Sequence, residues 1–241
     1  MADPRLEVLE RRLAKVGKII AVSSGKGGVG KSVTSVALAL ALRGKGFKVG
    51  LLDLDFTSPS THVILGVRDL KPIEDYGIIP PVAEGLSYMS IVFYASDNPA
   101  PLRGLDVSNS LIELMAITRW GELDYLIIDM PPGLGDATLD VIRLVKNISF
   151  LIVTTPSILA FETVKKLVNL LDSLKTPILG VVENMVMEDK SRIRGEVDKL
   201  GIRYLGEIAY DAGLEASMGS VDRLKETRFY GSLERILKGL L

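Results

Sequence analysis

The chain is predicted to fold as an α/β protein with a doubly wound, mostly parallel sheet and helices on both of its faces. Short apolar segments, typical of buried parallel strands, alternate six times with segments of helical periodicity along the 241 residues. The first apolar segment leads through a glycine-rich loop into a helical segment, as in parallel strand–loop–helix units. We expect one domain over residues 1–241, with 66–108 as an irregular excursion over the carboxyl edge of the sheet.

Periodicity and turn residues give the expected elements in order. The segment 49–53 is apolar up to its final aspartate, and the helix before it is expected to end at Gly44-Lys45-Gly46. Prolines interrupt 66–108, so only one short strand is expected there. The expected helices are 5–16, 31–44, 107–118, 136–145, 159–174, 190–200 and 231–240, and the expected strands are 18–23, 49–53, 86–91, 125–129, 149–154, 178–184 and 204–208.

Composition excludes several classes of function. The net charge is −1 and no run of basic residues stands out, which argues against a nucleic-acid partner. No apolar run reaches the length of a membrane span, and the N-terminus is too polar for a signal peptide, so we expect a cytoplasmic protein. Cysteine is absent, which excludes disulfides, thiolate zinc sites and cysteine-ligated iron–sulfur clusters in this chain.

The glycine-rich loop at 23–32 reads G-x-x-x-x-G-K-S, a Walker A phosphate-binding loop, between an apolar and a helical segment. Its backbone N–H groups can surround phosphate oxygens, and the helix directs its positive end at the anion. Lys31 is expected to reach the β/γ oxygens and Ser32 to bind Mg²⁺. The expected nucleotide-binding residues of this segment are Gly25, Lys26, Gly27, Gly28, Val29, Gly30, Lys31, Ser32 and Val33.

Acidic residues follow two further apolar strands. Asp53 and Asp55 come at the end of the second strand, at the sheet edge where ligands bind in open α/β folds. Asp129 ends another apolar run and matches a Walker B aspartate, which holds Mg²⁺ through water. The alternative is that these aspartates only cap loops. The prolines and glycines of 130–135 suit a loop that senses the γ-phosphate by taking discrete positions.

Lys26, near the start of the loop, resembles the extra lysine of the deviant Walker A motif in the Mrp/MinD/ParA class of ATPases. The string D-x-P-P-G-x-G-D at 129–136 resembles the Mrp branch, although Leu134 stands where that branch usually has threonine. The resemblance implies an ATPase of P-loop NTPase fold with ATP or ADP and Mg²⁺ as cofactors. It also implies a homodimer in the ATP state, in which Lys26 reaches the partner's phosphates.

The same resemblance implies roles for the remaining site residues. Lys26, Lys31 and Asp55 are expected to be catalytic, and Asp55 orients or activates the attacking water. Ser32, Asp53 and Asp129 are expected to hold Mg²⁺, partly through water. Asn184, at the end of the expected strand 178–184, is expected to read the adenine edge.

The chain departs from cluster-carrying Mrp proteins after Asn184, because it has no C-x-x-C pair there. This form resembles archaeal ATPases that help mature nickel–iron hydrogenases (HypB analogues), which implies a separate metal carrier or metalloenzyme client. One alternative is an iron–sulfur cluster assembly factor that holds no cluster through cysteines. Another is a positioning ATPase like MinD or ParA, with the amphipathic tail 232–241 on a membrane. A scaffold that binds nucleotide and hydrolyses it poorly is a further alternative.

Overall fold

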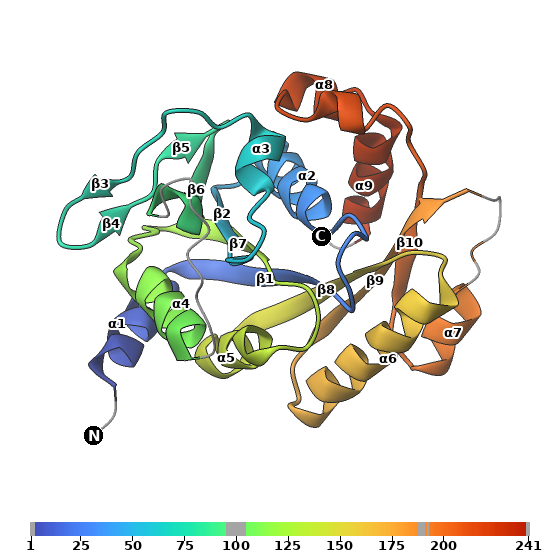
Figure 1. Ribbon diagram of the computed structural model, residues 1–241, viewed down its shortest axis with the longest axis horizontal. Helices are drawn as coiled ribbons and strands as arrows, with labels where there is room; N and C mark the ends of the chain where they lie inside the picture. The colour runs from blue at the N-terminus through green and yellow to red at the C-terminus, as the bar shows by residue number, and fades with distance from the viewer. Residues whose placement is uncertain (1–2, 95–104, 188–190, 192, 240–241) are drawn as a thin grey trace.

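The computed structural model describes residues 3–94, 105–187, 191 and 193–239 (Figure 1). The strands are β1 (Val16–Ser24), β2 (Val49–Asp53), β3 (Ile73–Glu74), β4 (Ile78–Ile79), β5 (Val82–Ala83), β6 (Leu86–Ser90), β7 (Leu123–Asp129), β8 (Ile148–Thr154), β9 (Ile178–Val186) and β10 (Tyr204–Ala209). The α-helices are α1 (Pro4–Leu13), α2 (Lys31–Gly44), α3 (Thr61–Leu65), α4 (Leu105–Ile117), α5 (Asp136–Leu144), α6 (Ile158–Ser173), α7 (Arg194–Lys199), α8 (Val221–Lys225) and α9 (Arg228–Lys238), with 3₁₀ turns η1 (Ile91–Phe93) and η2 (Glu215–Ser217).

The central sheet has eight strands in the order β10-β9-β8-β1-β7-β2-β6-β5. Its pairs are parallel except for β5 with β6, which confirms the predicted mostly parallel sheet. Strand β1 lies between β7 and β8, so successive strands are added first on one side of β1 and then on the other. Doubly wound sheets bind ligands at such a reversal, outside the carboxyl ends of the strands.

Helices cover both faces of the sheet, as predicted (Figure 1). Residues of α1, α4, α5, α6 and α7 pack into one core with one face of the sheet, and residues of α2, α3, α8 and α9 pack into a second core on the other face. The segment from Val33 to Leu42 of α2 is buried throughout, because the helix contacts β1, β2 and β7 on one side and α9 on the other. This burial holds the start of α2 rigidly at the sheet edge.

Side-chain caps explain where several helices begin. The Asp3 carboxylate accepts a hydrogen bond from the N–H of Arg5 before α1, and Pro4 occupies the first position of that helix. Ser157 and Thr227 cap α6 and α9 by accepting hydrogen bonds from the N–H groups three residues later. The starts of α6 and α9 lie one and three residues before the positions expected from periodicity.

The region from 61 to 94 contains more structure than the sequence predicted. One strand was expected between 66 and 108, whereas the structure forms β3, β4, β5 and β6 there, with α3 just before them. Strands of two residues have no measurable alternation, and a helix of five residues has too few turns to display a period. The helix α8 was missed for the same reason. Residues 95–104 of this region lie outside the described part of the chain.

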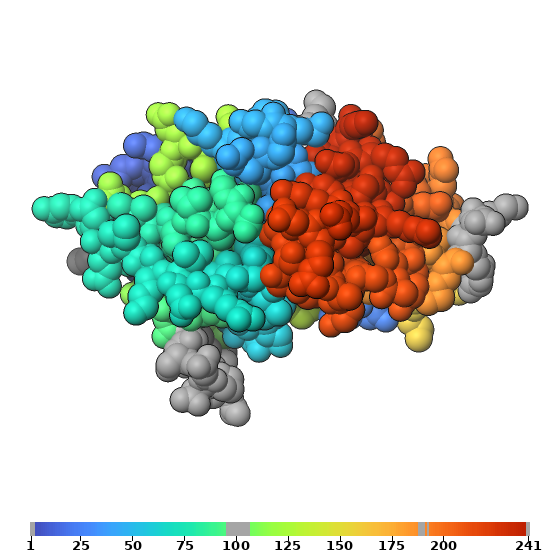
Figure 2. All heavy atoms as spheres, turned by 90° about the horizontal axis from the view of Figure 1, so that it is seen from above, coloured from blue at the N-terminus to red at the C-terminus, as the bar shows by residue number. Residues whose placement is uncertain are grey.

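The C-terminal helix α9 packs on the core. Its apolar face (Phe229, Tyr230, Leu233, Ile236 and Leu237) is buried against the core that α2 and the sheet share. In Figure 2 the red C-terminal segment lies against the blue segment that contains α2. The surface that a membrane-bound tail helix needs is therefore covered in this structure. Within residues 3–94, 105–187 and 193–239, none of the helices has the length and apolar character to span a bilayer.

Candidate functional site

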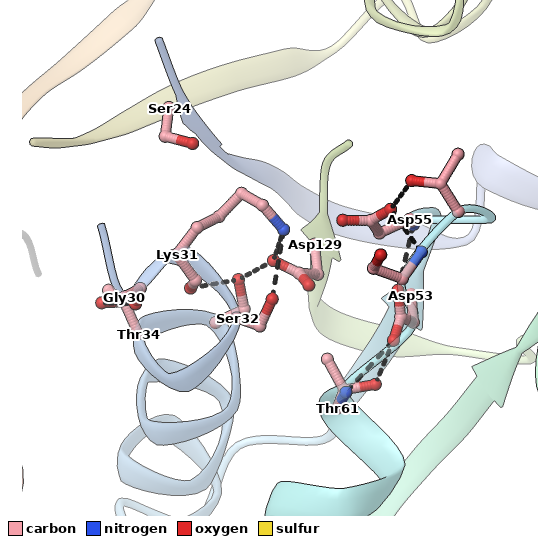
Figure 3. A network of polar contacts seen from close by, with 12 residues as sticks. Ser24, Gly30, Lys31, Ser32, Thr34, Asp53, Asp55, Thr61 and Asp129 are labelled. Atoms are coloured by element: carbon pink, nitrogen blue, oxygen red, sulfur yellow. Dashed lines mark hydrogen bonds and ion pairs between the residues drawn. The ribbon is translucent and has the colours of Figure 1, made fainter. Parts of the chain in front are cut away.

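Four strand ends bring polar residues to one edge of the sheet. Ser24 ends β1, Asp53 ends β2, Asp129 ends β7 and Asn184 lies near the end of β9. Asp53 and Asp129 are direct neighbours across the β2–β7 pair. A cavity of about 480 Å³ opens at this edge, lined by Ser24, Lys26, Gly27, Gly28, Gly30, Lys31, Ser32, Val33, Asp55, Thr57, Ser58, Ser60, Ile64 and Pro132. The structure thus brings the predicted glycine loop and the predicted acidic residues into one site (Figure 3).

The glycine loop accepts no side chain at two of its positions. Gly30 has φ +87°, and a Cβ there would lie 2.2 Å from Asn184 Nδ2. A Cβ on Gly25 would lie 2.1 Å from Thr163 Oγ1 and 2.8 Å from the backbone carbonyl carbon of Thr163. Distances below 3 Å force atoms to move, so the loop is in direct contact with β9 at one end and with α6 at the other. Open space surrounds the Cβ positions of Gly27 and Gly28 between them.

Lys31 points from the first turn of α2 into the acidic edge (Figure 3). Its Nζ lies 2.8 Å from Asp129 Oδ1, and the two side chains are 7% and 0% exposed. Lys31 Nζ also donates to Ser32 Oγ at 3.2 Å. Ser35, one turn further along α2, donates its hydroxyl to the same Asp129 oxygen at 2.8 Å. Sequence reasoning missed Ser35, although its spacing of four from Lys31 places it on the same face of a helix.

The residues around Asp129 fit a bound Mg²⁺. Asp129 Oδ2 is buried and has no hydrogen-bond partner among the residues that the structure describes. An unpaired carboxylate oxygen suits a hard cation; it belongs to an aspartate paired with Lys31, and Lys31 and Ser32 both line the cavity. Burial and the neighbouring Asp129 raise the pKa of Asp53 to about 7, and the hydrogen bonds from Thr61 and Asp55 oppose this shift. Two buried carboxylates beside one lysine favour the uptake of a further positive charge.

Asp55 lines the cavity. Its side chain is 6% exposed, and its Oδ1 accepts hydrogen bonds from Thr57 Oγ1 at 2.7 Å and from the N–H of Ser58 at 3.1 Å. These donors hold one oxygen in place within the loop that follows β2. The position suits a carboxylate that acts on a group bound in the cavity.

The two remaining predicted residues differ in exposure. Lys26 is exposed and lines the cavity. Asn184 is buried, and its Nδ2 donates to the backbone oxygen of Val29 at 2.9 Å. Its amide therefore ties β9 to the glycine loop. The predicted contact of Asn184 with adenine remains a prediction.

The sequence matches a known family over most of its length. The family profile described as "ParA: NUBPL iron-transfer P-loop NTPase" matches residues 15–224. The chain belongs to this family. The resemblance to the Mrp/MinD/ParA class is therefore confirmed, as is the P-loop NTPase fold.

Individual members of the family support the same placement. An "Iron-sulfur cluster carrier protein" of Pseudomonas fragi is 45% identical over 179 residues, which are 73% of this chain and 62% of that protein. A protein of the same name from Saccharolobus solfataricus is 38% identical over 223 residues, covering 86% of this chain and 75% of that relative. The chain thus spans less than two thirds of the Pseudomonas protein.

A solved structure that is similar to this chain contains a nucleotide. It is a nucleotide-binding protein from Archaeoglobus fulgidus in complex with ADP, with 35% identity to this chain and a TM-score of 0.76. The match covers 92% of this chain and 93% of that protein. Membership of a P-loop NTPase family and this ADP-bound neighbour are consistent with ATPase activity.

Proposed function

We propose that the chain binds ATP with Mg²⁺ in this cavity and hydrolyses it as a homodimeric switch. The observation that carries the proposal is the ion pair of Lys31 with the buried Asp129 beside the glycine loop. Lys31 lines the cavity, Asp129 Oδ2 has no hydrogen-bond partner within the described part of the chain, and the Cβ positions of Gly27 and Gly28 face open space. A triphosphate with its cation supplies one partner for each of these groups. Few other ligands carry both charges in one molecule.

Each residue has a distinct role in the proposed reaction. On nucleotide binding, Lys31 Nζ leaves Asp129 and contacts the β/γ-phosphate oxygens. The N–H groups of the loop surround the same oxygens. Ser32, Asp53 and Asp129 are the residues that would hold Mg²⁺, and the ion would supply neutralisation of the charge that develops on the phosphate oxygens. Asp55, held by Thr57 and Ser58, orients the attacking water. Lys26 is exposed and thus free to contact the phosphates of a second copy.

We further propose that this switch serves the assembly of metallocofactors. The names of the relatives support iron–sulfur cluster assembly, and the absence of cysteine implies that the cluster is held by another protein. Maturation of a nickel–iron hydrogenase with a separate metal carrier is the second candidate, which rests on the cysteine-free form of the chain. In both cases ATP binding and hydrolysis change the affinity for a client.

Two experiments test the proposal. The first measures release of phosphate from ATP by the purified chain with Mg²⁺ and with EDTA, using Asp129→Asn as the matched variant. Turnover that needs Mg²⁺ and is lost in Asp129→Asn supports the proposal, and lack of ATP or ADP binding in calorimetry overturns it. The second isolates proteins that bind the tagged chain from its native source with a non-hydrolysable ATP analogue. Recovery of iron–sulfur apoproteins supports cluster assembly, whereas a nickel carrier or hydrogenase subunit supports nickel maturation.

A further inference from the structure

The carboxylate of Asp53 accepts hydrogen bonds from both ends of the loop that contains Asp55. Asp53 Oδ1 accepts a hydrogen bond from the N–H of Asp55 at 3.0 Å. Its Oδ2 accepts two more from Thr61, from the N–H at 3.2 Å and from the hydroxyl at 2.6 Å (Figure 3). These bonds join both ends of the segment 54–60, called the Asp55 loop below, to one buried side chain. Three donors use most of the hydrogen-bonding capacity of a carboxylate.

A buried tyrosine extends this set of contacts into the core. The hydroxyl of Tyr88, on β6, lies 2.8 Å from Thr61 Oγ1, and Tyr88 is fully buried. When Asp53 is ionised it can only accept, so the Thr61 hydroxyl must give its proton to Asp53. Tyr88 must then donate to Thr61. The hydrogen bonds therefore run in one direction, from Tyr88 through Thr61 to Asp53.

The position of Tyr88 is itself set by the sheet. It pairs with Leu51 of β2 in the parallel β2–β6 ladder, and its ring packs edge-to-face on Phe93 with centroids 5.6 Å apart. A phenol fixed in this way provides a rigid donor. Thr61, by contrast, begins the five-residue helix α3, and its hydroxyl forms its hydrogen bonds with Asp53 and Tyr88.

We propose that Thr61 and Tyr88 are positioning residues, which fix the Asp55 loop through Asp53 and thereby set the place of the Asp55 carboxylate. The proposal rests on the proposed ATPase function. It assigns to Asp53 a role in holding this loop, in addition to any contact with the metal shell. The position of Asp55 in the cavity depends on the conformation of this loop. Loss of the Thr61 hydroxyl weakens the contact of the loop with Asp53 and therefore shifts Asp55, while the glycine loop stays in place.

Four variants test the proposal at pH 8. Thr61→Val removes the hydroxyl at nearly constant shape, and Thr61→Ser retains it. Tyr88→Phe removes the tyrosine hydroxyl that donates to Thr61. Tyr125→Phe is the matched control, because Tyr125 is a buried tyrosine at the start of β7, packs on Phe47 and pairs with Val49 at the opposite end of β2.

The kinetic readout separates positioning from binding. Since a small misplacement of a reacting group costs up to about 100-fold in rate, we expect Thr61→Val to lower kcat about 10- to 100-fold and Tyr88→Phe about 3- to 10-fold. KM for ATP and the affinity for ADP should stay within about twofold of wild type, because the glycine loop is unchanged. Thr61→Ser should regain most of the turnover, and Tyr125→Phe should match wild type.

Hydrogen exchange supplies a readout that does not need turnover. The amides of Asp55 and Thr61 both donate to Asp53, so their exchange in the nucleotide-free protein should be at least about 10-fold faster in Thr61→Val and in Tyr88→Phe. Wild-type exchange in both variants overturns the proposal, as does a loss in Thr61→Val that appears in KM alone. If the wild-type chain shows no ATPase activity, the proposed function is wrong. The exchange rates alone then show whether Thr61 and Tyr88 hold the Asp55 loop.

Discussion

Replacing Lys31 with methionine removes the cation from a buried ion pair, and we expect a large loss of stability in the nucleotide-free protein. Lys31 Nζ lies 2.8 Å from Asp129 Oδ1, with the side chains 7% and 0% exposed. Methionine retains an unbranched apolar stem, so packing around the stem is largely kept. The substitution leaves Asp129 buried beside Asp53 without the charge of the lysine. The loss of stability therefore measures the electrostatic cost of that arrangement.

The magnitude follows from the burial of the pair. Removal of one partner from a buried ion pair costs about 3–5 kcal/mol, whereas an exposed pair contributes about 0–1 kcal/mol. The chain provides an exposed comparison, since Lys146 Nζ lies 2.6 Å from Glu10 Oε1 with side chains 72% and 62% exposed. In a protein of this size the buried loss corresponds to a fall in Tm of roughly 6–20 °C. Lys146→Met should lower Tm by less than about 4 °C.

The assay is denaturant unfolding and thermal unfolding at pH 8 in EDTA, without nucleotide. The double variant Lys31→Met/Asp129→Asn should regain part of the lost stability, because it removes the unpaired charge as well. Equal losses of stability in Lys31→Met and Lys146→Met would refute the reasoning. So would a double variant that is less stable than Lys31→Met alone.

Four further outcomes are expected. Lys26→Ala should bind ADP normally but lose ATP-dependent dimerisation; an unchanged ATP dimer in light scattering would remove the proposed contact across the dimer. Asp55→Ala should bind ATP with turnover lowered at least about 100-fold, and wild-type phosphate release would exclude Asp55 from the reaction. Burial raises the pKa of Asp53 from 3.8 to about 7, so the folded state binds more protons in this range and its unfolding free energy should fall as the pH rises from 3.8 to about 7. Asp53→Asn should flatten this dependence in denaturant titrations, and an unchanged slope would contradict the assignment. Gly30→Ala should displace Asn184, cost about 1–2 kcal/mol from the positive φ alone and weaken ADP binding in calorimetry; wild-type affinity would contradict the close contact between these residues.

Local signals made much of the fold and of the nucleotide loop predictable. The segment 25–32 stands between an apolar strand and a helical segment, and each of these signals lies within a few residues of the next. Asp53 and Asp129 each end an apolar strand, so their arrival at one sheet edge followed from the parallel fold. The structure adds that they are adjacent strand partners.

Contacts between distant residues could not be predicted in the same way. Lys31 and Asp129 are 98 residues apart in the chain, and nothing in either segment indicates that the lysine turns to the aspartate. The bond between Thr61 and Tyr88 depends on the register of β6 beside β2, which periodicity does not determine. The strands β3, β4 and β5 are two residues long, so tertiary pairing rather than local preference forms them.

The internal partner of Lys31 also affects which anions the cavity can select. An incoming anion must compete with Asp129 for the lysine, so ligand entry is an exchange of counter-ions and not a simple addition. Free sulfate or inorganic phosphate would form an ion pair with Lys31 but would leave the Asp129 carboxylate buried without its cation. A nucleotide that arrives with its own divalent ion satisfies both groups at once. We therefore expect the Lys31–Asp129 pair to disfavour simple anions relative to a nucleotide with its cation.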